Sequence, residues 1–388
     1  MQQARRYGPG DLIANKYRLG DEIGRGGVGV VYAADHVQLE HRVAVKFLRV
    51  GVDDAKTVER FRREARAAAR IRSEHVARVS DFGDHDGSPY LVMEYLAGED
   101  LECALATTGA FAMADAVHHV LQACEALAEA HVQGVVHRDL KPSNLFLATR
   151  PDGVRVIKLL DFGISKETHG TSASITGTAG WIGSPRYMSP EQLQTASDLD
   201  AGSDIWGLGV TLFELLTNES PFAVASVPLT CVSILKDAPK SLRELRPELP
   251  VALERVILRC LEKTRAERWA NVAELALALR AFGTPGIVDI SVERIVGLHC
   301  QAAASHACDP VDEIESRIEQ VGGRTALPRQ AMTARELTTL ELDHRAGFLL
   351  SIIDGQLTVD DLLDVSGMAP LETMRLLGGL IELGAIVT

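Results

Sequence analysis

A change of pattern at Gly98 is the feature that most constrains how this chain can fold. Before it, residues 17–50 alternate apolar and polar side chains in short runs punctuated by glycine, which predicts antiparallel strands. His75 to Phe82 and Tyr90 to Met93 predict further strands, and Ala55 to Arg72 has apolar residues at helical spacing. After Gly98, patterns rich in alanine and leucine predict helices over 113–133, 205–216, 251–262 and 272–282. We therefore expect an α+β fold, with a β-rich lobe before a mainly helical one.

The helical patterns stop at Gly283 to Gly286, and periodicity stays weak up to Pro328, so we expect a linker over residues 283–330. Beyond it, Thr358 begins a helix-capping pattern and a helix-turn-helix pattern follows, in a shape that resembles a winged-helix fragment. Nine acidic side chains against three arginines over 332–388 disfavour DNA binding. The expected parts are an N-terminal tail over 1–16, the main domain over 17–282, the linker over 283–330, and a small, mostly helical docking or dimerisation module over 331–388.

Composition narrows the class of partner. The formal net charge of -13 over 388 residues repels nucleic acid and anionic membranes at long range, so proteins or small molecules are the expected partners. The six cysteines form no Cys-x-x-Cys pair and residues 1–10 lack an apolar signal stretch, which favours a reducing, cytoplasmic location. The longest weakly charged run, Ile205 to Phe213, is far shorter than the roughly 20 apolar residues that span a bilayer. Abundant arginine and alanine are associated with GC-rich bacterial genomes.

A Gly-x-Gly-x-x-Gly-x-Val run follows Ile23, formed by Gly24, Gly26 and Gly29 with an additional Gly27. Glycines let backbone N–H groups approach phosphate without a Cβ in the way. Alone, such a run also fits a plain hairpin or a dinucleotide-binding loop. A dinucleotide loop requires a helix next, whereas the chain continues as a strand pattern. This favours a glycine-rich flap over a nucleotide.

A cation follows on the next predicted strand. Alternation places Ala44 and Lys46 on the same face of that strand, so a small residue lies beside a positive charge, which suits adenine above phosphate. Glu64, on the predicted helix, is a candidate partner that would direct Lys46 toward the α- and β-phosphates. The alternative is that Glu64 is one more exposed helix charge, because arginines flank it on both sides.

Two later segments are the most specific in the chain, and they read His137-Arg138-Asp139-Leu140-Lys141-Pro142-Ser143-Asn144 and Leu159-Leu160-Asp161-Phe162-Gly163. Together with the glycine run and Lys46, they match the eukaryotic-like (Hanks-type) protein kinase family in order and spacing. Residues 17–282 therefore resemble a protein kinase of this family. The resemblance implies a bilobal fold and transfer of the γ-phosphate of ATP to protein hydroxyls.

The resemblance also implies roles for individual residues. Asp139 would orient the substrate hydroxyl and accept its proton, and Lys141 would neutralise charge on the transferred phosphoryl group. Asn144, which also belongs to the catalytic set, would bind Mg²⁺ together with Asp161, because this ion prefers carboxylate, amide, water and phosphate oxygens. Catalysis would then depend on positioning and electrostatic stabilisation.

An ATP-binding pocket is implied by the same resemblance. Val31 and Ala44 would cover the adenine, Phe146 would lie below it, and the backbone of Glu94 and Leu96 would hydrogen-bond its edge. An ordinary apolar core and a turn are the alternative for these residues. The full predicted set, with Met93 at the back of the pocket, is Ile23, Gly24, Gly26, Gly27, Gly29, Val31, Ala44, Lys46, Glu64, Met93, Glu94, Leu96 and Phe146.

The expected acceptor is serine or threonine, because tyrosine kinases of this family place arginine near the position of Lys141. Gly183 to Glu191 resembles the substrate-docking stretch of the family. Two serines depart from its pattern, since Ser184 stands where threonine is common and Ser189 where alanine is common. Both are small, so we expect the same role.

Two internal braces are implied by the resemblance. Glu191 should pair with Arg268, and Asp204 should brace the backbone of His137 and Arg138.

The segment between Asp161 and Glu191 is rich in hydroxyl groups. A phosphate there would meet Arg138 and could order the segment. We expect autophosphorylation, with Thr176 and Thr178 as the best candidates. The alternative is a flexible loop that contains hydroxyls by composition alone.

Two other functions remain open at this stage. A pseudokinase scaffold would bind partners without phosphoryl transfer, although Lys46, Glu64, Asp139, Asn144 and Asp161 are all present. A small-molecule phosphotransferase would lack the docking stretch. The expected cofactor is Mg²⁺ with ATP as co-substrate, and the expected partners are protein substrates and a second copy or docking protein at the C-terminal module.

Overall fold

The computed structural model divides into two compact units, Met1–His299 and Cys300–Thr388. The residues that the structure describes are 7–26, 29–48, 55–162, 185–194, 199–222, 224, 226–306, 317–319, 321–332, 344–353, 355–366 and 370–387.

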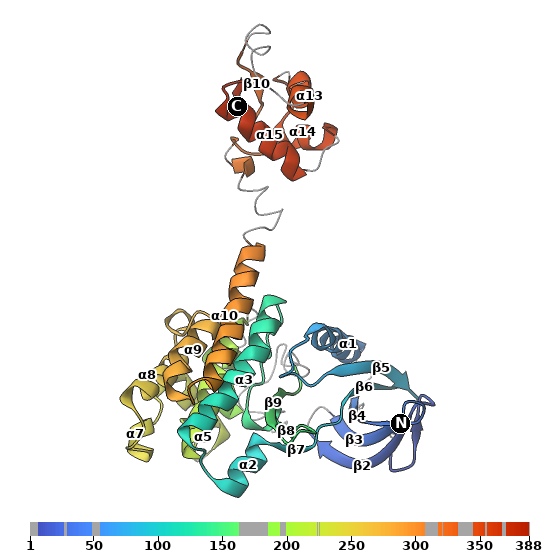
Figure 1. Cartoon of the computed structure of the whole chain (residues 1–388), viewed down its shortest axis with the longest axis vertical. Coiled ribbons are helices and arrows are strands. Elements are labelled where there is room, and N and C mark those ends of the chain that lie inside the picture. The colour runs from blue at the N-terminus through green and yellow to red at the C-terminus, as the bar shows by residue number, and fades with distance from the viewer. Residues whose placement is uncertain are drawn as a thin grey trace. The chain divides into compact units, whose positions relative to one another are not determined.

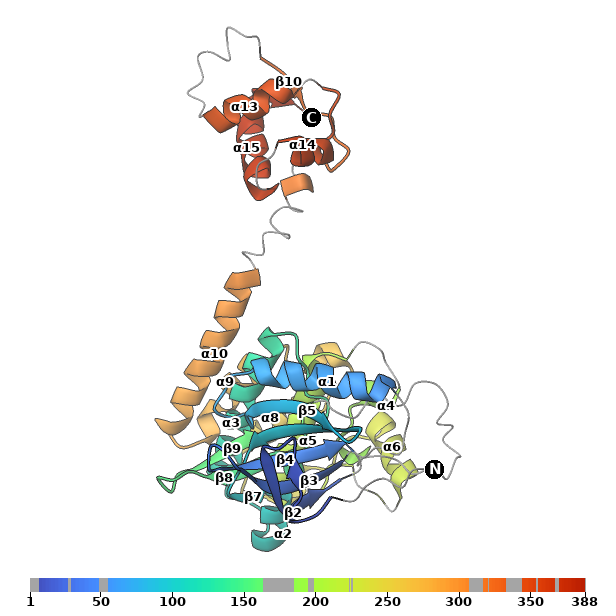
Figure 2. The same cartoon turned by 90° about the vertical axis from the view of Figure 1, so that its right-hand side faces the viewer.

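The first unit begins with a six-stranded antiparallel sheet in the order β1-β2-β3-β4-β6-β5 (Figures 1 and 2). Its strands are β1 (Leu12–Ile13), β2 (Tyr17–Arg25), β3 (Gly29–His36), β4 (His41–Leu48), β5 (Val79–His85) and β6 (Ser88–Glu94). Helix α1 (Ala55–Arg70) lies beside β5, where Phe61 and Ala65 pack against Leu91 (Figure 2). The predicted strands and the predicted helix are confirmed.

The other face of this sheet is covered by the residues before β2. Tyr7 stacks on Phe47 with ring centroids 4.3 Å apart, and Tyr32 Oη donates a hydrogen bond to the Tyr7 carbonyl at 2.9 Å. Ile13 is fully buried. Residues 7–16 thus pack on the sheet, although the sequence predicts a tail over 1–16. Alternation could not indicate β1, because that strand has only two residues.

A helical lobe follows, with a small sheet in the order β7-β8-β9 (Figure 1). That sheet consists of β7 (Gly98–Asp100), β8 (Leu145–Thr149) and β9 (Arg155–Leu159). The helices are α2 (Leu101–Thr108), α3 (Met113–Val132), α4 (Pro190–Leu193), α5 (Ala201–Thr217), α6 (Val227–Lys236), α7 (Leu242–Leu245), α8 (Val251–Cys260) and α9 (Val272–Leu279). Trp206 and Phe213 of α5 are fully buried in the core of this lobe. The predicted α+β fold, with a β-rich lobe before a mainly helical one, is confirmed.

Helix α10 (Ile287–His306) lies within the segment that the sequence predicts to be a linker. Val288, Val292 and Ile295 recur at helical spacing and are at most 2% exposed, in the same core as α3 and α5. The polar residues between them mask this stripe in the sequence. The first half of α10 is therefore part of the first unit.

The second unit has a small core of its own. Its elements are β10 (Arg329–Gln330), α13 (His344–Ile352), α14 (Val359–Val365), α15 (Pro370–Glu382) and β11 (Ile386–Val387), and β10 pairs antiparallel with β11. Thr358 and Asp361 form the predicted capping box at the start of α14. Ile318 and Val321 join this core, so the packed module begins before residue 331.

Candidate active site

The register of the first sheet places the predicted nucleotide-binding side chains on one face. Val31 of β3 lies opposite Lys46 of β4, and Ala44 of β4 lies opposite Met93 of β6. Because side chains alternate along a strand, all four point toward the same side. The face predicted for Ala44 and Lys46 is confirmed, and both residues are buried.

Lys46 forms the central ion pair of this site with Asp161, in which Nζ lies 2.5 Å from Oδ1. The lysine side chain is 6% exposed and the aspartate side chain 39%, so the charge pair lies at the edge of a buried region. Asp161 has a left-handed φ of 53°, a strained value for a residue with a Cβ. The side chain of Glu64, the partner predicted for Lys46, lies outside the described residues.

Asp139 is surrounded by the other two predicted catalytic residues. Lys141 Nζ donates to Asp139 Oδ2 at 3.0 Å. Asn144 Nδ2 donates to the Asp139 carbonyl at 2.7 Å and to Oδ2 at 3.1 Å. These contacts fix the carboxylate, because cations and amide donors restrain both its charge and its orientation.

The backbone that carries Asp139 is braced as predicted. Asp204 is buried and accepts hydrogen bonds from the amides of His137 and Arg138, both at 2.8 Å. Burial alone would raise the pKa of Asp204, but the hydrogen bond from His131 and the neighbouring charges outweigh it and lower the pKa. Arg138 has a φ of 66°, which this bracing holds in place. His131, at 2.8 Å from Asp204, was not predicted.

His137 links the two motifs directly. Its Nε2 lies 2.8 Å from the Leu160 carbonyl, and its Nδ1 lies 3.3 Å from the Asp139 amide, an arrangement that fits a neutral ring with the proton on Nε2. Burial lowers the pKa of His137, which keeps the ring neutral. The Phe162 ring packs 4.8 Å away. The segments before Asp139 and Asp161 are therefore one packed unit.

The glycine run shows why glycine is required at its end. A Cβ on Gly29 would lie 2.1 Å from the Phe47 carbonyl oxygen, so strand β4 itself excludes any other residue there. The amide of Gly26 donates to the Gly29 carbonyl at 2.9 Å, which closes the described part of the turn. Ile23 is half exposed before this turn. Gly27 lies outside the described residues.

Hydrogen bonds hold the backbone and the side chain of Glu94, which is predicted to contact the adenine. Its amide donates to the Arg78 carbonyl at 2.9 Å. Its carboxylate accepts from Lys158 Nζ at 2.8 Å. Leu96 follows β6 in a half-buried loop, and Phe146 lies half-buried on β8.

The predicted pair between Glu191 and Arg268 is confirmed as a bidentate, buried ion pair. Both guanidinium nitrogens Nη1 and Nη2 lie 2.8 Å from the carboxylate. Ser203 Oγ donates to the same carboxylate at 2.8 Å. Ser189 forms a capping box with Gln192 at the start of α4, which gives this departure from the family pattern a local role.

The remaining predicted residues of the docking and phosphorylation segment are not described. Gly183, Ser184, Thr176 and Thr178 lie outside the described residues, so their roles stay predictions.

The donor set fits Mg²⁺. Asn144 uses its amide nitrogen on Asp139 and Asp161 uses Oδ1 on Lys46, so one amide oxygen and one carboxylate oxygen remain as ligand atoms. Mg²⁺ typically binds one or two carboxylates together with water and substrate phosphates. No group of three or more His, Cys, Asp or Glu in the described part of the chain is placed to hold a metal. The ion would therefore depend on nucleotide phosphates for further ligands.

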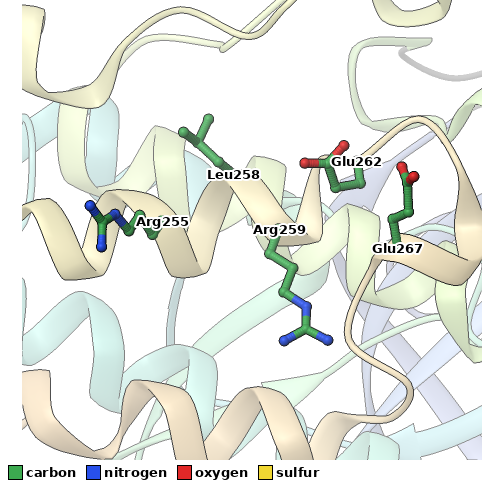
Figure 3. Close-up of a pocket in the computed structure, with 5 residues that line it drawn as sticks. All are labelled: Arg255, Leu258, Arg259, Glu262 and Glu267. Carbon is green, nitrogen blue, oxygen red and sulfur yellow. The ribbon is translucent and has the colours of Figure 1, made fainter.

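An open hollow at the end of α8 lies apart from these residues. Its lining, drawn in Figure 3, consists of Arg255, Leu258, Arg259, Glu262 and Glu267. It mixes both signs of charge and includes none of the predicted site residues, so it suggests no ligand.

Within the described residues, no helix is both long and apolar enough to cross a membrane.

Comparison with known proteins agrees with this geometry. Residues 17–278 match the protein kinase domain family. The serine/threonine-protein kinase pkn3 of Myxococcus xanthus is 40% identical over 278 residues, which cover 70% of this chain and 51% of that protein. A probable serine/threonine-protein kinase of Clostridium acetobutylicum is 36% identical over 267 residues, covering 69% and 40%. PknB of Mycobacterium leprae is 35% identical over 268 residues, covering 68% and 42%. The match thus spans about half the length of these relatives or less.

Proposed function

The chain belongs to the bacterial serine/threonine branch of the protein kinase family, and on that basis we propose that it transfers the γ-phosphate of ATP to serine and threonine hydroxyls of proteins. The observation that best supports this proposal is that an ion pair and a cluster of three residues are already formed and are linked to each other. Lys46 contacts Asp161, while Lys141 and Asn144 hold Asp139, and the Leu160 amide donates to the Asn144 carbonyl at 2.9 Å between them.

Each residue has a defined task in this reaction. Asp139 orients the substrate hydroxyl and takes its proton as the oxygen attacks the γ-phosphorus. The bond from the γ-phosphorus to the bridging oxygen breaks, and ADP leaves with the electron pair. Lys46 binds the remaining phosphates, and Lys141 balances charge on the group in transfer. Asn144 and Asp161 would hold Mg²⁺, and the chemistry that this ion would supply is neutralisation of phosphate charge.

Replacing Asp161 with asparagine should reduce label transfer from γ-labelled Mg-ATP to a generic protein acceptor by at least roughly 10²-fold. The change removes the negative charge that pairs with Lys46 and binds the metal, but keeps the side-chain shape. Asp35→Asn is the matched control, because Asp35 is exposed and its cation contact, with Arg42, is 4.0 Å long.

The outcomes distinguish an active kinase from a pseudokinase scaffold. Transfer by wild type and Asp35→Asn, but not by Asp161→Asn, supports the kinase. Absence of transfer in all three proteins, with ATP still bound, would favour a pseudokinase scaffold.

We also propose that autophosphorylation at Thr176 or Thr178 activates the enzyme. The support is Arg138 next to Asp139, which offers a cation to a phosphate on the following segment. Phosphopeptide mapping tests this proposal. Full activity of a chain with no phosphate between residues 163 and 184 would contradict the proposed activation by autophosphorylation.

The second unit is proposed to be a docking or dimerisation module that acts in the cytoplasm with the kinase, as part of signal transduction. Its separate core and its acidic composition support a protein partner rather than nucleic acid. The molar mass measured by light scattering, or the amount of partner captured, should differ between the full chain and one ending at His306. Equal mass and equal capture would remove this proposal, and cell fractionation tests the location.

A further inference from the structure

A polar network outside the active site ties α10 to two other elements. Arg294 Nη1 donates to Glu74 Oε1 at 2.9 Å and to Glu125 Oε2 at 3.3 Å. Glu74 lies in the segment 71–78, between α1 and β5, and Glu125 lies on α3. One guanidinium therefore joins three parts of the first unit that are far apart in sequence.

Glu125 is the member of this network that most needs a partner. Its side chain is 7% exposed, whereas those of Glu74 and Arg294 are 50% and 54% exposed. An exposed pair such as Arg294 with Glu74 contributes little, but a buried carboxylate without a cation is strongly unfavourable. His75 Nε2 is 3.8 Å from Glu125, and Arg294 is closer. The hydrogen bond that Arg294 donates to Glu125 is also the main cause that raises the pKa of Arg294.

Beyond Glu125, the network continues through His75, which forms hydrogen bonds with the backbone of β9. His75 is buried, and its Nδ1 lies 2.9 Å from the Ile157 carbonyl. The Ile157 amide donates to Gln122 Oε1 on α3 at 2.6 Å. The Leu159 amide donates to the His75 carbonyl at 2.8 Å, and the Ala77 amide donates to the Leu159 carbonyl at 3.0 Å. Strand β9 is thus attached to α3 and to the segment that contains Glu74.

Strand β9 leads directly into the active site. It ends at Leu159, the next amide bonds to the Asn144 carbonyl, and the residue after that is Asp161, the partner of Lys46. A shift of β9 would therefore displace a metal ligand and the ion pair of Lys46. Displacements of about 1 Å at a reacting group can cost roughly 10²-fold in rate.

We infer that Arg294 is a positioning residue for phosphoryl transfer, which acts through Glu125 and His75 to fix β9 and with it Asp161. This inference rests on the proposed kinase activity. Val288, Val292 and Ile295 hold α10 in the core by themselves, so removing the Arg294 charge leaves the helix packed.

Arg294→Ala in the full chain should lower kcat per folded molecule by roughly five- to tenfold, with the KM for acceptor peptide unchanged. Glu125→Gln on that background should restore kcat to within about twofold of wild type, because a neutral side chain no longer needs the cation. Arg294→Lys should retain part of the wild-type kcat, since lysine supplies the charge but on a shorter side chain without the planar guanidinium. Arg280→Ala is the control: it breaks an exposed pair with Asp289 near the start of the same helix and should leave kcat unchanged.

Amide hydrogen exchange gives a readout that does not require activity. Arg294→Ala should speed exchange at the amides of Ala77, Ile157 and Leu159, and Glu125→Gln should reverse this. A merely structural role would instead speed exchange along α10 and reduce stability, with kcat per folded molecule unchanged.

Unchanged kcat and exchange in Arg294→Ala, or failure of Glu125→Gln to reverse the effects, would overturn the inference. If wild-type protein transfers no phosphate, the proposed function fails instead, and that result is separate from the exchange pattern.

Discussion

Replacing Asp139 with asparagine is expected to lower kcat by roughly 10²–10⁴ while leaving ATP binding close to that of wild type. Asparagine keeps the shape of the side chain and an oxygen for the hydrogen bonds from Lys141 and Asn144. It cannot take the proton of the substrate hydroxyl. Steady-state kinetics with a protein acceptor measures kcat, and calorimetry with ATP measures the affinity.

Asp35→Asn again serves as the control and should match wild type in both measurements. A kcat of Asp139→Asn within about twofold of wild type would contradict the role of general base, whose loss costs orders of magnitude. Loss of ATP binding would show instead that Asp139 supports the fold. Because Asp139 lies next to the braced Arg138 backbone, separating these two effects is necessary.

Replacing Arg268 with alanine should lower the free energy of unfolding of the first unit by roughly 3–5 kcal/mol. The side chain is fully buried and forms a bidentate pair with Glu191. It also donates to the carbonyls of Gly202 and Glu262, both at 2.8 Å. Alanine would leave a buried carboxylate and two carbonyls without their donor. Urea unfolding followed by tryptophan fluorescence measures the change, since Arg268 lies 5.1 Å from the Trp206 ring.

Arg155→Ala is the matched control, because Arg155 and Glu99 form an exposed pair expected to contribute less than about 1 kcal/mol. Equal losses in the two variants would contradict the assignment.

The buried pair of Glu191 and Arg268 also makes the stability of the first unit depend on pH. Burial would raise the pKa of Glu191, but the hydrogen bonds from Arg268 outweigh it and lower the pKa from 4.5 to about 2. Its stabilisation is therefore present above pH 4.5 and lost as the pH falls toward 2, and Glu191→Gln should flatten that slope.

Much of the site could be predicted because its residues carry specific chemistry at short spacing. Asp139, Lys141 and Asn144 lie within six residues, so the motif already determines which groups meet. The braces of Asp204 and Glu191 were implied by family resemblance and found in the structure. Periodicity located the main helices of the second lobe, since their apolar stripes are long.

Contacts that depend on tertiary packing could not be predicted in this way. Lys46 bonds to Asp161, 115 residues away, and no local pattern indicates this partner. The predicted partner, Glu64, has its side chain outside the described residues, so that pairing stays a prediction. The reason for Gly29 is the carbonyl of Phe47 on a neighbouring strand, which only the register reveals. Arg294 gives no signal in the sequence, because its partners Glu74 and Glu125 lie in unrelated elements.

Helix α10 separates two boundaries that are usually treated as one. The family match ends at residue 278, but the hydrophobic core of the same unit continues to Ile295. The family match thus covers a shorter stretch of chain than the one that shares this core. A chain cut at the end of the match would expose the surface that Val288 and Val292 now cover, and it would leave Glu125 without Arg294. The minimal folding unit is therefore expected to be longer than the domain that the family match covers.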